Sequence, residues 1–133
     1  MTKNVNLWVD AELTWILDDA WMRCVGQTDP VSLRGCDCWG GLDLSHVGDV
    51  TAFVLLFHEN DRFQLLPFFW IPEDKTLEKE KKENINYDKW VADGYVTVTP
   101  GNVVDYDFVK ADILRVTAGY NLKSISYNRR NAS

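Results

Sequence analysis

The chain has 133 residues, of which 46% are hydrophobic and 26% are charged, a composition typical of one globular domain or part of one. Its 20 acidic residues outnumber its 14 basic residues, which gives a net charge of -6. Proteins that bind nucleic acid by bulk electrostatics use Lys and Arg side chains, which release counterions from the phosphates. The net negative charge of this chain argues against that mode of binding. A protein of this charge that acts on nucleic acid would need a local binding site or a basic surface on a partner protein.

The cysteines and the first residues of the chain indicate the cellular compartment. Cys24, Cys36 and Cys38 are too few for a disulfide framework. A zinc site would need four ligands, and His46 and His58 do not stand at ligand spacing, so we expect buried, reduced thiols. The first residues contain no apolar signal region, and no stretch approaches membrane-spanning length. We therefore expect a cytoplasmic protein.

Residues 1–34 are predicted to form an arm, a helix and a connecting loop ahead of the main domain. Over Asp10–Cys24 the apolar residues recur at the spacing of one helical face, with Asp10 placed to cap the start and Gly26 the end. The apolar arm at residues 7–9 is expected to pack on a segment upstream. The domain proper is predicted to span residues 35–133.

Three consecutive strands are predicted next. The first carries Asp43, and the following two are the apolar runs Thr51–His58 and Arg62–Ile71, joined by a turn at residues 59–61. A carboxylate in a buried apolar strand costs several kcal/mol unless it is paired or coordinates a metal. A divalent cation is the expected reason for this carboxylate, so Asp43 is the first candidate metal ligand.

The second half of the chain predicts helices followed by one more strand. The predicted elements are a charged, solvated helix over residues 73–83, a helical turn over Tyr87–Ala92, a short extended run over Tyr95–Thr99, a helix over Asp105–Tyr120 and a final strand over Leu122–Tyr127. The crossover through the long helix should bring the final strand parallel to, and beside, the first. We expect a mixed α/β sheet, with three antiparallel strands, a parallel fourth and flanking helices. The end of the final strand is expected next to Asp43.

Four linked motifs resemble the nuclease domain of tailed-phage terminase large subunits. They are Gly41-Leu42-Asp43-Leu44-Ser45 with Gly48-Asp49-Val50-Thr51-Ala52, Pro67-Phe68-Phe69-Trp70-Ile71-Pro72-Glu73-Asp74, Thr99-Pro100-Gly101-Asn102-Val103-Val104-Asp105-Tyr106, and Ile125-Ser126-Tyr127-Asn128-Arg129. The similarity spans nearly the whole chain, and the order of several motifs makes it specific. It implies a ribonuclease H-like fold and the N-terminal portion of such a domain, incomplete at its C-terminus.

The resemblance implies a metal-dependent endonuclease that cleaves double-stranded DNA during genome packaging. In such domains acidic side chains at the ends of adjacent strands hold two Mg²⁺ or Mn²⁺ ions, which activate a water and stabilise the leaving oxygen. Asp43 matches the family's first-strand acid, and Asn128 stands where the family has an acid on a later strand. The implied partners are double-stranded DNA, the terminase ATPase domain, the small subunit and the portal.

Asn128 departs from the family pattern. An amide oxygen can ligate Mg²⁺ but brings no charge, and hard cations are held mainly by carboxylates, so metal affinity should fall. A further family acid lies in a downstream segment that this sequence lacks, and no ATP-binding Gly-x-x-x-x-Gly-Lys-Ser/Thr loop occurs. We expect weak metal binding and no measurable cleavage. An excised fragment, a prophage remnant and a frame-disrupted gene are all open as explanations.

Other polar residues near the expected site have two interpretations each. His46 could contact a phosphate or the attacking water and Arg129 the DNA backbone, although an exposed loop histidine and a polar residue after a strand are the simpler interpretations. Asp49 could assist from its loop, but turn formation is its commoner role. Asp105 and Asp107 are interpreted as a cap and a charge at a helix start, and not as catalytic residues.

Two classes of function follow from these features. The chain is a metal-dependent nuclease domain that uses Asp43, or it is a non-catalytic remnant or protein-interaction module that retains the fold. Another enzyme of the same fold, such as a transposase or junction resolvase, is disfavoured by the motifs at residues 67–74 and 99–106. Because the chain ends just after its last strand, apolar sheet surface and an unpaired edge should be exposed, and we expect self-association.

Overall fold

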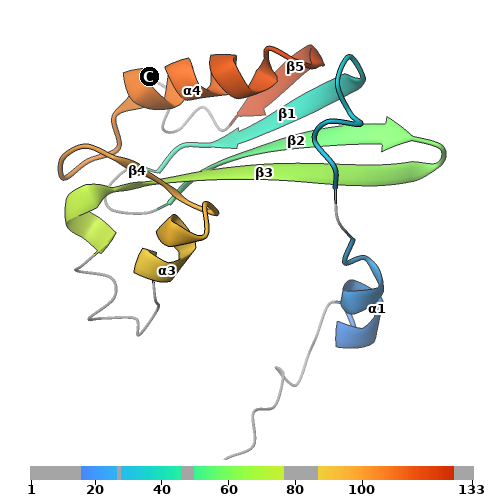
Figure 1. Ribbon diagram of the computed structural model, residues 1–133, viewed down its shortest axis with the longest axis horizontal. Helices are drawn as coiled ribbons and strands as arrows, with labels where there is room; N and C mark the ends of the chain where they lie inside the picture. The colour runs from blue at the N-terminus through green and yellow to red at the C-terminus, as the bar shows by residue number, and fades with distance from the viewer. Residues whose placement is uncertain (1–15, 27, 46–49, 77–86, 128–133) are drawn as a thin grey trace, which may run out of the picture.

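The computed structural model describes residues 16–26, 28–45, 50–76 and 87–127 (Figure 1). Within these residues, one sheet has its strands in the order β4-β3-β2-β1-β5. The strands are β1 (Asp37–Asp43), β2 (Thr51–Glu59), β3 (Arg62–Pro72), β4 (Thr97–Thr99) and β5 (Asn121–Tyr127), and the helices are α1 (Asp18–Arg23), α3 (Tyr87–Ala92) and α4 (Tyr106–Thr117). The mixed α/β sheet predicted from the sequence is therefore confirmed.

Strands β1, β2 and β3 form the predicted antiparallel meander. The β2–β3 hairpin closes through Asn60 and Asp61, whose φ angles are 50° and 59°. Two consecutive positive φ angles give a type I′ turn, whose twist matches that of the flanking strands. This local turn fixes the register of the longest strand pair in the sheet.

The last strand lies where the crossover rule predicts. β5 pairs in parallel with β1, from Asp37 opposite Asn121 to Leu42 opposite Tyr127. The sheet differs from the prediction at its other edge, where β4 pairs in parallel with the end of β3. The extended run predicted over Tyr95–Thr99 is thus a fifth strand. Three residues carry too little periodic pattern to predict their pairing.

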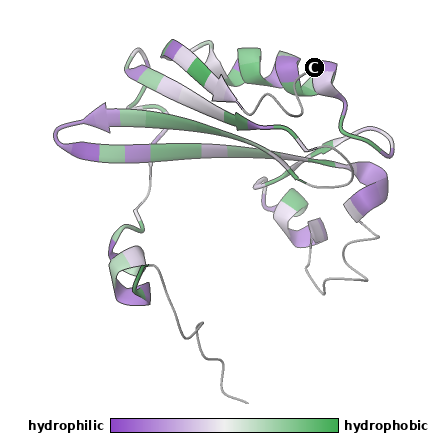
Figure 2. Ribbon diagram, turned by 180° about the vertical axis from the view of Figure 1, so that it is seen from behind, coloured by the Kyte–Doolittle hydropathy of each residue, from purple (hydrophilic) through white to green (hydrophobic). Residues whose placement is uncertain are grey.

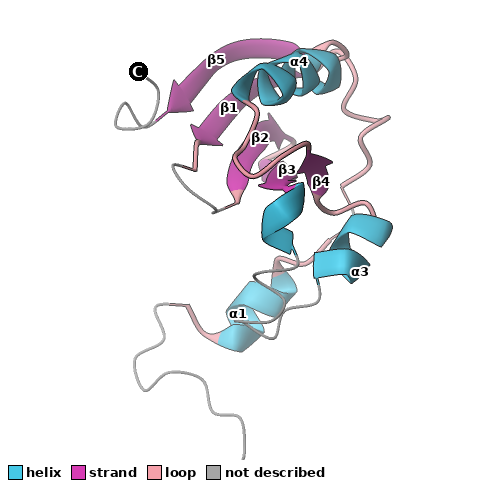
Figure 3. Cartoon of the chain, turned by 90° about the vertical axis from the view of Figure 1, so that its left-hand side faces the viewer, coloured by secondary structure: helices cyan, strands magenta, loops and turns pink. Residues whose placement is uncertain are grey.

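Helix α4 covers one face of the sheet (Figure 3). Val109 and Ile113 of this helix pack in a buried cluster with Phe53 and Leu55 of β2 and Trp70 of β3. Since alternate residues of a strand share a face, this packing defines the covered face of the sheet.

Polar contacts fix the position of α4. Trp70 Nε1 donates a hydrogen bond of 3.0 Å to Asp112 Oδ2. The helix begins at its N-cap Asp105, whose Oδ1 accepts from the backbone N–H groups of Asp107 and Phe108, each at 3.0 Å. The predicted capping role of Asp105 is confirmed, and Asp107 lies in the first turn, where a carboxylate meets the positive end of the helix dipole.

Gly40 lies on this covered face at a point with no room for a side chain. A Cβ atom there would lie 2.8 Å from Phe53 Cε2 and 3.1 Å from Ile125 Cγ1. Glycine lets β1, β2 and β5 pack under α4 without displacing either side chain.

The opposite face of the sheet is only partly covered by the described residues. Ile71, Tyr87 of α3 and Val96 form a second, smaller buried cluster at one end. The rest of this face, here called the open face, includes Trp39, Gly41, Asp43, Ala52, Val54, Leu56, His58, Phe63, Leu65, Pro67, Ser124 and Ser126. Figure 2 shows apolar residues along the middle of β2 and β3.

Large apolar side chains of the open face are exposed to solvent. The exposed fractions are 42% for Trp39, 55% for Leu65 and 69% for Phe63. Exposed apolar sheet surface was expected from the sequence, and it is present among the described residues. Self-association through it stays a prediction.

The N-terminal helix differs from the prediction. α1 begins at Asp18 after an extended Leu17 and is followed by its C-cap at Cys24, so the described part holds no continuous helix from Asp10 to Gly26. None of its residues is buried, and Figure 1 shows it apart from the sheet. A short helix without packing partners is marginal in water, which explains the limited length. Asp10 and the apolar arm lie outside the described residues.

The segment that leads into β1 packs on the domain. Leu33 is fully buried in the cluster under α4, Tyr120 Oη donates to the Pro30 carbonyl at 3.3 Å, and the Gly35 N–H donates to the Gly119 carbonyl at 2.8 Å. The division of the chain at residues 34 and 35 stays a prediction. Of the described helices, none is long and apolar enough to cross a membrane.

Candidate functional site

Asp43 is the last residue of β1 and lies on the open face, opposite Ala52 of β2. The sequence predicted a buried carboxylate that needs a compensating charge, and this is wrong because the end of β1 is exposed. A water-facing carboxylate pays little desolvation cost, so burial gives no argument for a cation. Support for a cation comes from geometry. No hydrogen bond or ion pair joins the Asp43 carboxylate to another described residue.

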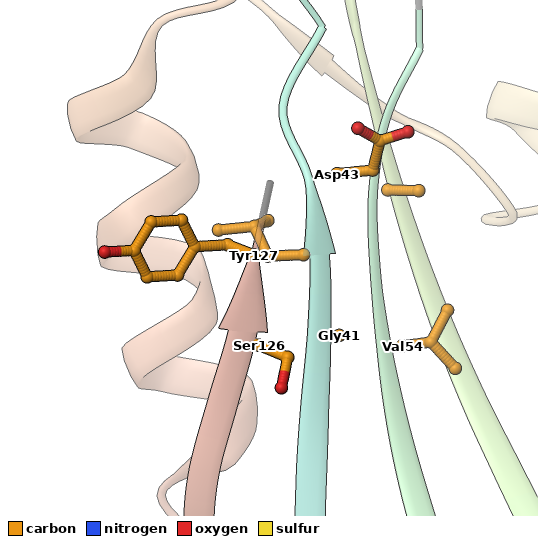
Figure 4. Close-up of a pocket in the computed structure, with 7 residues that line it drawn as sticks. Gly41, Asp43, Val54, Ser126 and Tyr127 are labelled. Carbon is orange, nitrogen blue, oxygen red and sulfur yellow. The ribbon is translucent and has the colours of Figure 1, made fainter. Parts of the chain in front are cut away.

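An open hollow of about 410 Å³ lies beside this carboxylate. It is lined by Gly41, Leu42 and Asp43 of β1, Ala52 and Val54 of β2, and Ser126 and Tyr127 of β5. Figure 4 shows Ser126, Gly41 and Val54 at one level across the three strands, with the Asp43 carboxylate beyond them and the Tyr127 ring turned away from it. Among the described residues, the hollow therefore has a largely apolar floor, with the Ser126 hydroxyl and the Asp43 carboxylate beside it.

The end of β5 lies next to the end of β1, as the sequence predicted. Ser126 is the register partner of Gly41, and Tyr127 is the partner of Leu42, one residue before Asp43. Asn128, His46, Asp49 and Arg129 lie outside the described residues. Their predicted roles as a second ligand, a phosphate or water contact, an assisting acid and a DNA contact stay predictions.

Hydroxyl groups close the base of the loop that follows Asp43. The Ser45 N–H donates to Thr51 Oγ1 at 3.1 Å, and the two hydroxyl oxygens lie 3.0 Å apart. Tyr106 Oη donates to the Ser45 carbonyl at 2.7 Å, which ties this loop base to the start of α4. Ser45 and Thr51 are buried, so the two bonds between them are shielded from water, whereas the bond from Tyr106 is partly buried. This clasp of Ser45, Thr51 and Tyr106 positions the strand end that carries Asp43.

The donor set for a divalent cation is partial among the described residues. The described part of the chain contains no group of three His, Cys, Asp or Glu side chains that could hold a metal. The exposed Asp43 carboxylate has the oxygen chemistry that Mg²⁺ and Mn²⁺ prefer. One carboxylate fits such an ion as a single ligand, and further oxygen ligands must come from residues outside the described ranges or from water.

The other electrostatic contacts of β1 lie at its opposite end. Lys123 Nζ lies 3.0 Å from Asp37 Oδ1. The hydrogen bond from Lys123 holds the pKa of Asp37 below its ordinary value, and a bond from Asn121 adds to this. The pKa of Cys36 is raised because its Sγ donates to Glu59 Oε1 at 2.9 Å. These contacts hold β5 and β2 on β1 and are remote from Asp43 along the strand.

Sequence reasoning missed several residues at this site. Gly41 and Ser126 were part of the quoted motifs but received no role, because their proximity depends on the pairing of the first and last strands. Alternation along a strand would have placed Gly41 and Asp43 on one face. The clasp of Ser45, Thr51 and Tyr106 joins three separate segments and gives no signal in the sequence.

Comparison with known proteins agrees with these features. A family model described as "Terminase large subunit, endonuclease domain" matches residues 1–133. The large subunit of the terminase of Enterobacteria phage HK97 is 39% identical over 92 residues, which are 68% of this chain and 18% of that protein. Protein YmfN of Escherichia coli K12 is 27% identical over 118 residues, which are 81% of this chain and 26% of YmfN.

A solved structure has the same fold. The crystal structure of the HK97 bacteriophage large terminase superposes with a TM-score of 0.77 at 34% sequence identity, covering 86% of this chain and 23% of that one. The match supports the ribonuclease H-like form of the sheet. The chain spans about a quarter or less of the length of each of these relatives.

Proposed function

Because the chain belongs to the family of terminase large-subunit endonuclease domains, we propose that it is a metal-dependent endonuclease domain acting on double-stranded DNA during phage genome packaging. The observation that carries this proposal is the Asp43 carboxylate, exposed at the end of β1 beside the end of β5 and without a partner among the described residues. An unpaired acid beside a hollow is available to bind a cation.

In this proposal Asp43 is the first ligand of Mg²⁺ or Mn²⁺. Asn128, the residue after Tyr127 in the sequence, is the second. When bound, such cations supply an activated water and charge stabilisation for an in-line displacement at phosphorus. The chain's own contribution is to hold the Asp43 strand end through the clasp of Ser45, Thr51 and Tyr106. His46 and Arg129 are proposed contacts to the DNA.

We further propose that the site is weak in this chain. Asn128 offers a neutral amide where a carboxylate would add a negative charge, and hard cations bind best to charged oxygen ligands. Among the described residues Asp43 is the single acid that lines the hollow. We expect measurable but weak metal binding, and no measurable cleavage by the chain alone.

The partners follow from the same proposal. Double-stranded DNA is the substrate, and a terminase ATPase domain, a small subunit and a portal are the assembly partners. This places the protein's action in the cytoplasm of the host cell, where phage DNA is packaged. The net charge of -6 is consistent with DNA being delivered by such partners, since the chain's own charge repels phosphates.

Titration calorimetry with MnCl₂ on the full chain tests the metal site. We expect weak binding by the wild-type chain, loss of affinity of at least about tenfold in Asp43→Ala, and tighter binding in Asn128→Asp, because removing or adding a charged ligand changes affinity directly. Asp93→Ala, which removes an exposed acid beyond α3, is the matched control and should bind as the wild type does. Equal affinities in all four proteins would contradict the proposal.

A plasmid-nicking assay in MnCl₂ addresses cleavage separately. We expect no nicking above the level of Asp43→Ala. Efficient nicking that Asp43→Ala abolishes would establish the nuclease activity and would contradict the proposal that the site is weak.

A second candidate function is a non-catalytic interaction module. It is favoured by the open face, where Trp39, Phe63 and Leu65 are exposed together. Contiguous exposed apolar surface commonly marks a protein contact. Light scattering at high protein concentration tests it: self-association that Leu65→Lys removes would support this function, whereas a strictly monomeric mass would count against it.

A further inference from the structure

Two adjacent glycines of β1 lie in opposite environments, and the described residues give a structural reason for glycine at only one of them. Gly40 leaves no space for a Cβ atom beneath Phe53 and Ile125. A Cβ atom on Gly41 would meet no atom of the described residues within 4 Å, and Gly41 does not have a positive φ. Neither packing among the described residues nor backbone conformation therefore requires glycine at position 41.

Glycine in the interior of a strand carries a stability cost relative to residues with side chains, because it loses more conformational entropy and packs nothing. One physical reason to keep it is the close approach of another molecule to the backbone. Gly41 lies in the floor of the hollow, between Val54 and Ser126 and two residues before Asp43 on the same face (Figure 4).

We propose that Gly41 is a DNA-contact position, whose missing side chain lets the sugar-phosphate backbone of DNA lie against β1 and reach the Asp43 carboxylate. This inference rests on the proposed function and assigns a substrate-contact role to a residue that is not a metal ligand. Ala52 and Val54 give the deoxyribose an apolar surface, and Ser126 supplies a hydroxyl donor for a phosphate oxygen.

The charge of the hollow determines when DNA can enter it. Among the described residues that line it, Asp43 is the one with a charged side chain and none is basic. A phosphate beside an unneutralised carboxylate is repelled, so DNA binding in this hollow requires a divalent cation between the two. Binding of a DNA duplex by this chain should therefore depend on Mn²⁺ and be reversed by a chelator.

The test measures three quantities on the full chain and on Gly41→Ala and Gly41→Val. The probes are MnCl₂ in calorimetry, a short fluorescent DNA duplex with MnCl₂ in anisotropy, and urea for unfolding. We expect unchanged Mn²⁺ affinity and unchanged or higher stability, with DNA affinity about tenfold lower for Ala and lower still for Val, since one methyl group in a close contact changes binding by about this factor. Gly26→Ala is the matched control, because Gly26 also has open space around it but does not line the hollow.

The outcomes separate the inference from the proposed function. If the wild-type chain binds neither Mn²⁺ nor DNA, or if Asp43→Ala leaves both unchanged, the proposed function fails and the inference fails with it. If Mn²⁺-dependent DNA binding depends on Asp43 but is the same in Gly41→Ala, Gly41→Val and Gly26→Ala, the inference alone is overturned. Light scattering on the same proteins adds a check: a change in self-association with no change in DNA affinity would assign the hollow to a protein contact and would also overturn the inference.

Discussion

Gly40 and Gly41 summarise the difference between the two faces of this sheet. On the covered face, Phe53, Ile125 and the residues of α4 determine what fits, and a missing side chain is explained by atoms of the chain itself. On the open face the neighbours of Gly41 leave space, and Val54, the Ser126 hydroxyl and the Asp43 carboxylate line the same hollow. One face is thus specified by internal packing, and the other is available for binding.

The largest expected effect comes from comparing two leucines on opposite faces of the sheet. Leu55 is fully buried beneath α4, and Leu65 is 55% exposed on the open face. Leu55→Ala should lower the free energy of unfolding by about 2–5 kcal/mol, because it leaves a cavity in the core. Leu65→Ala should change it by less than about 0.5 kcal/mol.

Urea unfolding of both leucine variants measures the difference. Similar losses in the two variants would mean that the open face is covered in solution. The distinction between the two faces would then be wrong.

A smaller effect is expected from adding a methyl group beneath α4. Gly40→Ala places a Cβ atom against Phe53 and Ile125, and this overpacking should cost about 1–3 kcal/mol of unfolding free energy. Thermal and urea unfolding measure the loss. Combining Gly40→Ala with Phe53→Leu, which removes the nearest ring atoms, should reduce the effect of the glycine substitution; an undiminished effect in the Phe53→Leu background would contradict the packing explanation.

The hydrogen bond that Tyr106 makes in the clasp beside Asp43 should contribute modestly to stability. Tyr106→Phe removes the hydroxyl that donates to the Ser45 carbonyl and should cost about 0.5–1.5 kcal/mol. Hydrogen exchange at the Ser45 amide should also become faster, because this amide donates to Thr51 in the same clasp. Tyr95→Phe, which changes an exposed tyrosine, is the control; equal exchange rates at Ser45 in the two variants would remove the positioning role of Tyr106.

The smallest effect concerns the pair that joins β5 to β1. Because the hydrogen bond from Lys123 lowers the pKa of Asp37 below its ordinary value of 3.8, the ionised carboxylate stabilises the fold above that pH. The contribution is lost as the pH falls through the lowered pKa. Asp37→Asn should therefore be slightly less stable than the wild type near about pH 7, and the difference should shrink toward about pH 3.

Urea unfolding across this pH range measures the contribution of Asp37. Lys123→Met should also reduce the pH dependence, since it removes the cationic partner of Asp37 and leaves the hydrogen bond from Asn121. A difference between wild type and Asp37→Asn that does not change with pH would assign the effect to something other than ionisation.

Much of the covered face was predictable because its signals are local. β2 forms where the apolar run Thr51–His58 predicts a strand, and Asp105 caps α4 where a carboxylate before an apolar helical pattern predicts it. α1 shows the limit of such signals. Its apolar spacing predicted a longer helix, but no residue of α1 is buried in the described part of the chain, and apolar spacing alone does not provide a surface to pack on.

The candidate site was predictable only in part. The motif around Asp43 identified the acid, whereas its exposure depends on where β1 ends and could not be derived from an apolar sequence pattern. The proximity of Gly41 and Ser126 depends on the β1–β5 register, which shifts at an irregularity between Cys38 and Trp39 and joins segments far apart in the chain. Non-local register of this kind is not encoded in any short stretch of sequence.

Paramagnetic broadening of amide NMR signals by Mn²⁺ tests most directly whether the end of β1 binds a cation. In the wild-type chain, low concentrations of MnCl₂ should selectively broaden the signals of Leu42, Asp43, Ala52, Ser126 and Tyr127, which surround the hollow. In Asp43→Asn this selective broadening should disappear while the rest of the spectrum stays the same. Broadening that persists in Asp43→Asn, or that centres on the Asp37 end of β1, would contradict the account.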